Sequence, residues 1–175
     1  MDENTEINVS SQEIKKLFDK LTKNAKTSGY YLNPDKEFTN ALLEALLINE
    51  KRYGYQGCPC RLSAENRLED LDIICPCDYR DADVDEFGSC YCALYVSSDI
   101  AEGKKEPQPI PERRPIRKER MQFKSNAAFQ HKTDTSGLSK PVWRCRVCGY
   151  LCARDAPPTV CPICKAGKDR FERFM

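Results

Sequence analysis

Six cysteines between residues 58 and 92 form three Cys-x-Cys pairs: Cys58/Cys60, Cys75/Cys77 and Cys90/Cys92. The two thiols of such a pair do not readily join each other, because the small ring would be strained. Each pair therefore offers both sulfurs to one site, or divides them between two. Eleven cysteines in a chain that we expect in a reducing compartment indicate metal binding or redox chemistry rather than structural disulfides.

The number of thiols suggests how the six are used. A [4Fe–4S] cluster needs four thiolates, and the remaining two suffice for one redox-active disulfide. Pro59 and Pro76 stiffen the first two pairs, because proline fixes φ and lacks an N–H. The four ligands can be chosen in fifteen ways, and chemistry alone does not decide. Zinc is the competing interpretation, but zinc sites mostly use wider spacings and would leave the same two thiols unexplained.

The other five cysteines lie between residues 145 and 164. Cys145-x-x-Cys148 and Cys161-Pro-x-Cys164 are two knuckles separated by twelve residues, a spacing that fits one tetrahedral iron or zinc. Residues 142–175 are too few for an apolar core of their own, so a metal would supply the missing stability. Cys152 is the odd thiol, which we expect to be a small buried apolar residue.

The first six cysteines are expected to lie on the turns between helices. Ser10 and Glu13 match a capping box, and an apolar stripe at helical spacing continues from there to Gly29. A second helix is expected after Asn33 as cap and Pro34 as first helical residue.

We expect this second helix to end before Gly54. Ser63 is expected to cap a third helix through about residue 73, and a short fourth is expected over 83–87. The predicted fold is mainly α, with a small all-helical domain over 1–98 for the [4Fe–4S] cluster, its cysteines on the turns, and a small β domain over 142–175.

Residues 99–141 are predicted to be a Pro-rich basic linker. Four prolines lie between 107 and 115, and residues 101–140 carry a net charge of +5. Such a segment is expected to be extended and to tether the two domains, with a solvated tether favoured over a docking surface. His131, the one histidine, lies here, and we expect no metal or proton-transfer role for it.

Composition excludes several classes of protein. The net charge is +1, so nucleic acid is not an expected partner. The absence of an apolar run of 18 residues argues against a membrane span. The first residues are acidic and polar, unlike a secretion signal, and we expect a cytoplasmic protein.

The residues "GYYLNPD...CPCR...CPC...CYC" resemble the catalytic chain of ferredoxin:thioredoxin reductase, over about residues 12–98. The resemblance implies that four cysteines bind a [4Fe–4S] cluster: Cys58, Cys75, Cys77 and Cys90. It also implies that Cys60 and Cys92 form the active-site disulfide, with Cys60 as the nucleophile. Ferredoxin would be the electron donor, and thioredoxin or another disulfide the acceptor.

The residues "WRCRVCGY...CPIC" resemble rubredoxin, over about residues 142–175. The resemblance implies a one-electron iron site, with zinc as the alternative, bound by Cys145, Cys148, Cys161 and Cys164. Lys165 stands where rubredoxins usually have glycine, at a position that favours a positive φ. The fusion of the two domains is similar to the ferredoxin:disulfide reductases of methanogenic archaea and other anaerobes, and the rubredoxin domain would then relay electrons.

Two features depart from the reductase pattern. Tyr91 replaces the histidine of the third pair, and tyrosine is a poor acid–base group near neutral pH, although it can donate a hydrogen bond. The loop "DYRDADVDEFGS" is acidic and is expected to repel an acidic ferredoxin. Two other functions stay open: a non-enzymatic electron-transfer protein, and a zinc-stabilised interaction module.

Overall fold

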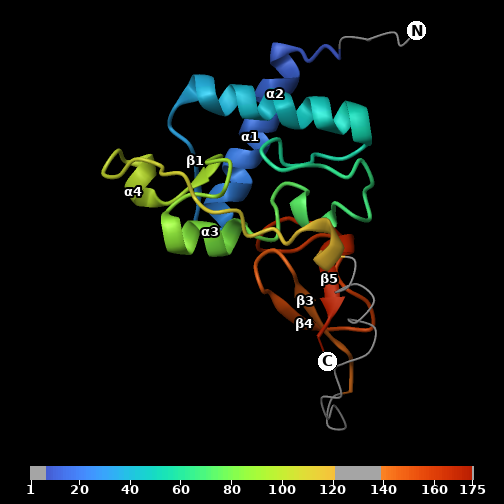
Figure 1. The fold of residues 1–175 in the computed structure, drawn as a ribbon. Coiled ribbons are helices and arrows are strands. Elements are labelled where there is room, and N and C mark those ends of the chain that lie inside the picture. The colour runs from blue at the N-terminus through green and yellow to red at the C-terminus, as the bar shows by residue number, and fades with distance from the viewer. Residues whose placement is uncertain (1–6, 121–138, 175) are drawn as a thin grey trace, which may run out of the picture.

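The computed structural model describes residues 7–120 and 139–174 as a helical N-terminal part and a small C-terminal sheet (Figure 1). The N-terminal elements are α1 (Ser11–Thr27), β1 (Tyr31–Leu32), α2 (Lys36–Tyr53), the 3₁₀ helix η1 (Leu71–Ile73), α3 (Arg80–Phe87), β2 (Tyr95–Val96) and α4 (Ser98–Ala101). The C-terminal elements are β3 (Val142–Cys145), β4 (Leu151–Ala153), the 3₁₀ helix η2 (Lys168–Arg170) and β5 (Phe171–Arg173). The predicted fold class is confirmed.

Aliphatic side chains of α1 and α2 form the main core. The buried residues of the two helices are Leu17, Leu21, Ala25, Leu42, Leu43, Leu46 and Leu47. Val84 of α3 and Leu94 join the same cluster. Burial of one such leucine contributes about 1.5–3 kcal/mol. This core gives the cysteine-bearing loops a rigid base.

The boundaries of α1 agree with the sequence, whereas the start of α2 does not. The predicted capping box of α1 is present, with Ser10 and Glu13 bonded to each other reciprocally. The N-cap of α2 is Asp35, whose side chain accepts from the Phe38 N–H, so the prediction of Asn33 as cap was wrong. Asn33 instead accepts from the Asp35 N–H through its side chain and bonds the Leu94 carbonyl through its own N–H.

The helix predicted over 63–73 is not formed, apart from the single turn η1. The Ser63 hydroxyl and the Ala64 N–H both donate to the Asp70 carboxylate, at 2.5 and 2.8 Å. Glu65 has a φ of 57°, which is incompatible with a helix. Side chains that bond nearby backbone compete with helix formation, and here a buried carboxylate draws the segment into a loop.

A short antiparallel pair, β1 with β2, was not predicted from the sequence. It joins the segment between α1 and α2 to the residues after the third cysteine pair, with Tyr31 opposite Val96. Gly88 ends α3 at a φ of 81°, and its carbonyl accepts from the Ser97 N–H. The pair of strands thus fixes the third cysteine pair against the helical core.

The C-terminal part is a three-stranded antiparallel sheet in the order β4-β3-β5. Trp143 of β3 lies opposite Cys152 on one side and Arg173 on the other. The buried cluster of this C-terminal part consists mainly of cysteines: Cys145, Val147, Cys161, Cys164 and Ala166. Such a core contains little apolar surface, so this domain depends on what its sulfurs bind.

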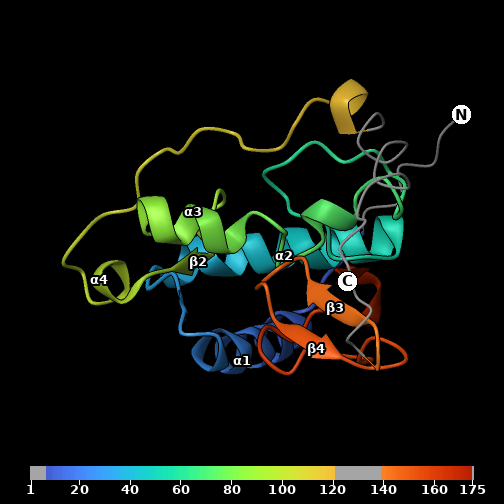
Figure 2. The ribbon, with the colours of Figure 1, turned by 90° about the horizontal axis from the view of Figure 1, so that it is seen from below.

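The segment after α4 runs past α3 toward the loop that follows α2 (Figure 2). The part of this segment nearest the cysteine-bearing loops is not the solvated tether that had been expected. Arg114 is 9% exposed and pairs with Asp70 and Asp72. His131 lies outside the described residues.

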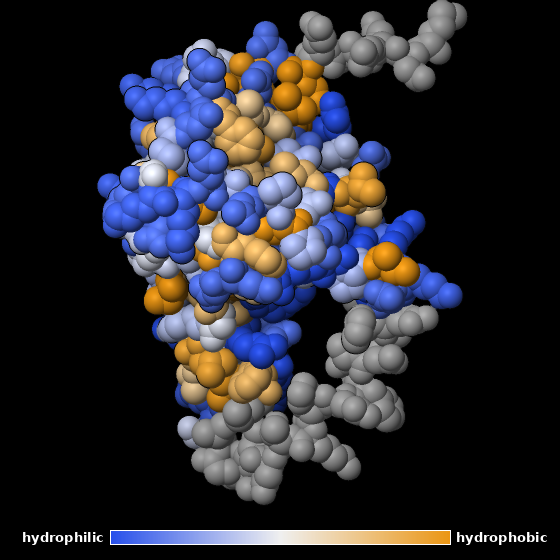
Figure 3. Space-filling model, turned by 60° about the vertical axis from the view of Figure 1, so that its left-hand side comes forward, coloured by the Kyte–Doolittle hydropathy of each residue, from blue (hydrophilic) through white to orange (hydrophobic). Residues whose placement is uncertain are grey.

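The surface offers only scattered apolar side chains on the face in Figure 3, where small groups of them lie between polar residues. The largest exposed fractions among apolar residues belong to Leu62 at 91% and Leu68 at 70%. Single exposed apolar residues are common on soluble domains. Among the described residues, none of the helices has the length and apolar character needed to cross a membrane.

Candidate functional site

Five of the six paired cysteines line one small cavity beneath α2. They are Cys58, Cys75, Cys77, Cys90 and Cys92. The rest of the lining consists of Leu46, Pro59, Arg80, Leu94 and Tyr95. Cys60 is exposed and is not part of the lining. The structure therefore separates one thiol, open to solvent, from five that face a common interior.

Backbone hydrogen bonds hold the first two pairs side by side. The Cys58 N–H donates to the Ile73 carbonyl and the Cys75 N–H to the Gln56 carbonyl, each at 2.8 Å. These bonds flank an isolated bridge between residues 57 and 74. The loop after α2 and the loop after η1 thus form one unit, in which the Cys75–Pro76 peptide bond is cis.

The third pair sits in a tight turn. The Ala93 N–H donates to the Cys90 carbonyl at 2.7 Å, and Ala93 has a φ of 52°. The Tyr95 N–H donates to the Cys90 sulfur at 3.3 Å. The Cys90 and Cys92 sulfurs lie 3.7 Å apart. The turn therefore brings both sulfurs of the pair to the cavity.

The pKa of the Cys60 thiol responds to one cysteine of its own pair and to one of the third pair. Hydrogen bonds from the Cys58 and Cys92 thiols lower the pKa of Cys60 to about 3, and the Arg61 charge acts in the same direction. Exposure and an available thiolate are what a thiol-exchange nucleophile requires. Cys60 is exposed and its pKa is lowered, and Cys92, the partner that the resemblance assigns to it, is one of the groups that lower this pKa.

The donor set fits an iron–sulfur cluster better than a single ion. Among residues 7–120 and 139–174, the one set of three or more potential ligands within 4.8 Å of one another is in the C-terminal domain. The N-terminal cysteines are more widely spread, as expected if each binds a different iron of a cluster. Burial raises the pKa of Cys77 to about 12, so this thiol favours its neutral form until a positively charged group binds it.

Tyr91, which stands between Cys90 and Cys92 in the sequence, is half-buried. Its ring centroid lies 4.5 Å from the Arg61 guanidinium carbon. Arg61 is itself buried, follows Cys60 directly, and was not singled out by the sequence analysis. The signal available in the sequence was the arginine in the quoted motif "CPCR".

The acidic loop is largely neutralised inside the protein, so the expected repulsion of a ferredoxin does not follow from its sequence charge. Asp78 pairs with Arg146 and Arg170, and Asp83 pairs with Arg61 and Arg113. Further pairs join Asp81 to Arg80 and Glu86 to Arg113. Most of these arginines lie far from the loop in the sequence, so the sequence alone did not show that the negative charge of the loop is compensated.

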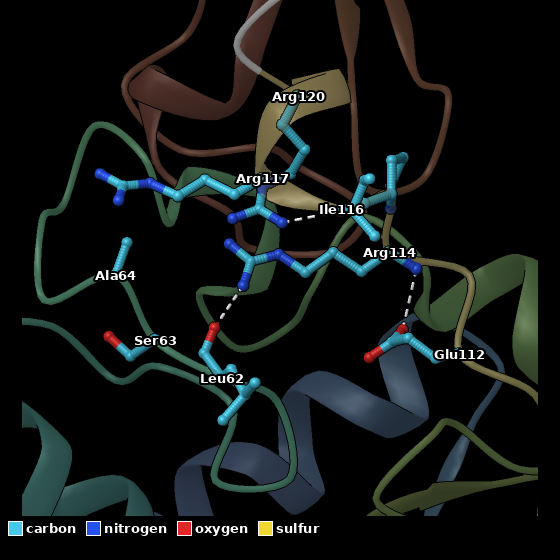
Figure 4. A pocket seen from close by; sticks show the side chains of 9 residues that line it. Leu62, Ser63, Ala64, Glu112, Arg114, Ile116, Arg117 and Arg120 are labelled. Atoms are coloured by element: carbon cyan, nitrogen blue, oxygen red, sulfur yellow. Dashed lines mark hydrogen bonds between the residues drawn. The ribbon is translucent and has the colours of Figure 1, made fainter.

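The segment 112–120 packs against the loop that follows the first cysteine pair (Figure 4). Arg114 donates to the Leu62 carbonyl, and its own N–H donates to the Glu112 carboxylate at 2.8 Å. A pocket of about 420 Å³ lies between the two stretches. Its lining residues are Leu62, Ser63, Ala64, Glu112, Arg114, Pro115, Ile116, Arg117 and Arg120. This segment therefore helps to shape the surface next to Cys60.

The four predicted ligands of the C-terminal metal site are brought together: Cys145, Cys148, Cys161 and Cys164. Two sulfur–sulfur distances across the knuckles are 3.6 Å. Ligands about 2.3 Å from one tetrahedral ion lie at such separations, so the geometry fits a single Fe or Zn. Cys152 is half-buried in β4 and is not in this group.

The two knuckles use the same turn. Gly149 and Lys165 each follow the second cysteine of a knuckle, with φ of 73° and 63°. Their N–H groups donate to the Cys145 and Cys161 carbonyls at 2.9 and 3.1 Å. The predicted positive φ at Lys165 is confirmed.

Arginines of the C-terminal domain contact the cysteine loops of the N-terminal domain. Arg146, inside the first knuckle, pairs with Asp78 at 2.6 Å, and Arg170 pairs with the same carboxylate. Arg170 also donates to the Ile74 carbonyl at 2.9 Å. Since Asp78 follows Cys77 directly, the C-terminal metal site is docked beside the second cysteine pair.

Comparison with known families agrees with this division. Residues 7–122, which are 116 of the 175 residues, match the family described as ferredoxin thioredoxin reductase catalytic beta chain. Residues 143–172 match the family described as rubrerythrin, rubredoxin-like domain. No curated protein matches the chain.

Proposed function

The chain belongs to the family of the ferredoxin thioredoxin reductase catalytic beta chain, and from this premise we propose that it is a ferredoxin-dependent disulfide reductase. One observation carries the proposal. Exposed Cys60 follows Pro59 on the wall of a cavity that the five other paired cysteines line, and the Cys92 thiol lowers the pKa of Cys60. The site thus combines a thiol that a substrate can reach with thiolate donors for a redox group.

The proposed ligands of a [4Fe–4S] cluster are Cys58, Cys75, Cys77 and Cys90. When bound, the cluster supplies one-electron transfer beside a disulfide that needs two electrons. The residues fit it, because the four sulfurs face one interior with Leu46 and Leu94 on the wall. Thiolates in an apolar cavity require a positive group to offset the cost of their burial.

Thiol exchange is assigned to Cys60 and Cys92. The Cys60 thiolate attacks a disulfide of thioredoxin or a similar acceptor, which forms a mixed disulfide and releases one acceptor thiolate. The Cys92 sulfur then attacks Cys60, which releases the acceptor as a dithiol and leaves a Cys60–Cys92 disulfide. Two electrons, one from each of two reduced ferredoxins, and two protons restore both thiols. Tyr91 is proposed to support the third pair, with its ring packed against Arg61.

The rubredoxin-like domain is proposed to relay electrons, with iron as its metal. The support is the docking through Asp78, which lies next to Cys77 and binds Arg146 beside Cys145. A donor that reduces the C-terminal site thus needs no second docking event to reach the N-terminal one. We propose a cytoplasmic location for this activity.

Metal analysis tests the proposal. Protein purified without oxygen is assayed for iron, acid-labile sulfide and zinc per chain. We expect about five irons and four sulfides, one cluster plus one rubredoxin iron. Four irons, four sulfides and one zinc would retain the reductase but contradict the relay. Zinc without sulfide would contradict the reductase and favour a zinc-stabilised interaction module.

A second assay separates a reductase from an electron-transfer protein. Thiols accessible to an alkylating reagent are counted before and after reduction. We expect two additional thiols after reduction, assigned by peptide mapping to Cys60 and Cys92. An unchanged count with full cluster content would favour a non-enzymatic electron-transfer protein.

A further inference from the structure

Arg61 occupies an unusual place beside the second cysteine pair. Its side chain is buried and lies between two aromatic rings, with the guanidinium carbon 4.7 Å from the Tyr79 centroid and 4.5 Å from the Tyr91 centroid. One of its nitrogens, Nη1, donates to the Cys77 sulfur at 3.2 Å. An arginine beside a sulfur is a charge-assisted donor to a predicted cluster ligand.

Two carboxylates fix this guanidinium from distant parts of the chain. Glu112 accepts from Nε at 2.9 Å, and Asp83 of α3 lies 3.4 Å from Nη2. A buried charge is tolerated only when such partners compensate it. The two rings and two carboxylates restrict Arg61 to one orientation, in which Nη1 donates to the Cys77 sulfur.

We propose that Arg61 is a positioning residue that stabilises negative charge on the Cys77 sulfur and holds the Tyr91 ring in place. This inference rests on the proposed function, because it concerns the cluster that Cys77 would bind. A hydrogen bond to a ligand sulfur and a nearby positive charge both favour the reduced, more negative form of a cluster. Arg61 therefore raises the midpoint potential of the site with a charge that does not titrate near neutral pH.

The Tyr91 side chain contributes through its ring in this arrangement. A guanidinium this close to an aromatic centroid makes a cation–π contact. Replacement by phenylalanine preserves the ring and removes only the hydroxyl. We therefore expect Tyr91→Phe to leave the midpoint potential unchanged and Tyr91→Ala to lower it, by less than the loss of Arg61 does.

The test is the midpoint potential of the cluster in the full-length holoprotein, from a redox titration followed by visible absorption and electron paramagnetic resonance. We expect Arg61→Gln to lower the ratio of reduced to oxidised cluster at a fixed potential at least tenfold, which is a fall of about 59 mV in the midpoint potential for one electron. Arg61→Lys keeps the charge and is expected to lie between this variant and the wild type. The matched control is Arg113→Gln, because Arg113 binds the same Asp83 carboxylate at 2.6 Å and has no contact with a cysteine among its described bonds.

Each outcome decides the proposal. An unchanged potential in Arg61→Gln and Arg61→Lys at full iron content would overturn it, and so would an equal shift in Arg113→Gln. If Arg61→Gln fails to bind iron, the shift of Arg61→Lys relative to Arg113→Gln decides. Wild-type protein without sulfide would instead overturn the proposed function itself, so the two failures are distinguishable.

Discussion

The two cysteine sites of this chain differ in how far apart in the sequence and in space their cysteines lie. The C-terminal site takes four ligands from 20 residues, 145–164, and their sulfurs lie within 4.8 Å of one another. The N-terminal site takes its cysteines from three loops over residues 58–92. Five of these cysteines line a cavity, together with side chains of α2 and α3. Local turns suffice to gather ligands for a single ion, whereas a larger group with an exposed thiol beside it requires loops fixed by a separate core.

The comparison predicts that metal loss affects the two domains differently. Cys161→Ser removes a proposed ligand from a domain with little apolar core. In small zinc-finger peptides, binding of a structural metal contributes about 10–16 kcal/mol to folding. We expect residues 139–174 to become sensitive to proteases, while the helical circular dichroism of the N-terminal domain is retained. Cys152→Ser is the matched control and should leave both properties unchanged. Loss of helical signal in Cys161→Ser would contradict the independence of the two domains.

Replacement of the exposed Cys60 thiol should abolish disulfide reduction without affecting cofactor binding. Cys60→Ser is expected to reduce disulfide reduction by at least roughly 10⁴-fold, the scale on which loss of a nucleophile acts. Because Cys60 does not line the cavity, the iron and sulfide content should stay at the wild-type level. Reduction of a thioredoxin disulfide is measured with excess reduced ferredoxin. Loss of iron in this variant would instead identify Cys60 as a ligand.

The N-terminal site should also depend on the buried ion pairs of Arg114 with Asp70 and Asp72. Arg114→Ala leaves the Asp70 and Asp72 carboxylates buried without their cation, and we expect a loss of about 3–5 kcal/mol in the free energy of unfolding. Arg117→Ala is the control, since the pair of Arg117 with Glu69 is more exposed and its loss should change the free energy of unfolding far less. Equal effects in chemical denaturation would show that burial of Arg114 does not matter.

The contact between the two sites can be weakened at one carboxylate. Asp78→Asn removes the charge that Arg146 and Arg170 share, and we expect docking to lose about 1.5–3 kcal/mol. Hydrogen exchange at amides 74–78 and 168–171 should become faster. Asp85→Asn, on the same acidic loop, removes a charge without involving the C-terminal arginines. Similar exchange in both variants would contradict docking through Asp78.

The smallest expected effect concerns backbone strain at the positive-φ residue of each knuckle in the C-terminal site. Lys165 holds a positive φ that a side chain disfavours, so Lys165→Gly should stabilise the domain by about 1 kcal/mol. Gly149→Ala imposes the same strain on the other knuckle and should destabilise it by about 1–2 kcal/mol. Thermal unfolding of the metal-bound protein measures both. A lower melting temperature in Lys165→Gly would show that the Lys165 bond to the Pro162 carbonyl outweighs the strain.

Much of the molecule followed from short-range sequence rules. The capping box of α1 and the left-handed residue after α2 depend on contacts within a few residues, so their sequences predicted them. The C-terminal site could be predicted for the same reason, because each knuckle is a local turn. The third helix was wrongly predicted because Asp70, six residues from Ala64, draws backbone and side-chain donors into a loop.

Tertiary structure alone decided which charges are buried and which thiol is exposed. The partners of the Arg61 and Arg114 side chains lie between 16 and 52 residues away in the chain, at Cys77, Asp70, Asp72 and Glu112 among others. No local pattern marks such pairs, since a charged side chain is stable in the interior only once its distant partner is in place. The sequence by itself therefore determined the ligands and their spacing. The fold determined their environment: the neutralised acidic loop, the docked C-terminal domain and the arginine that faces the second cysteine pair.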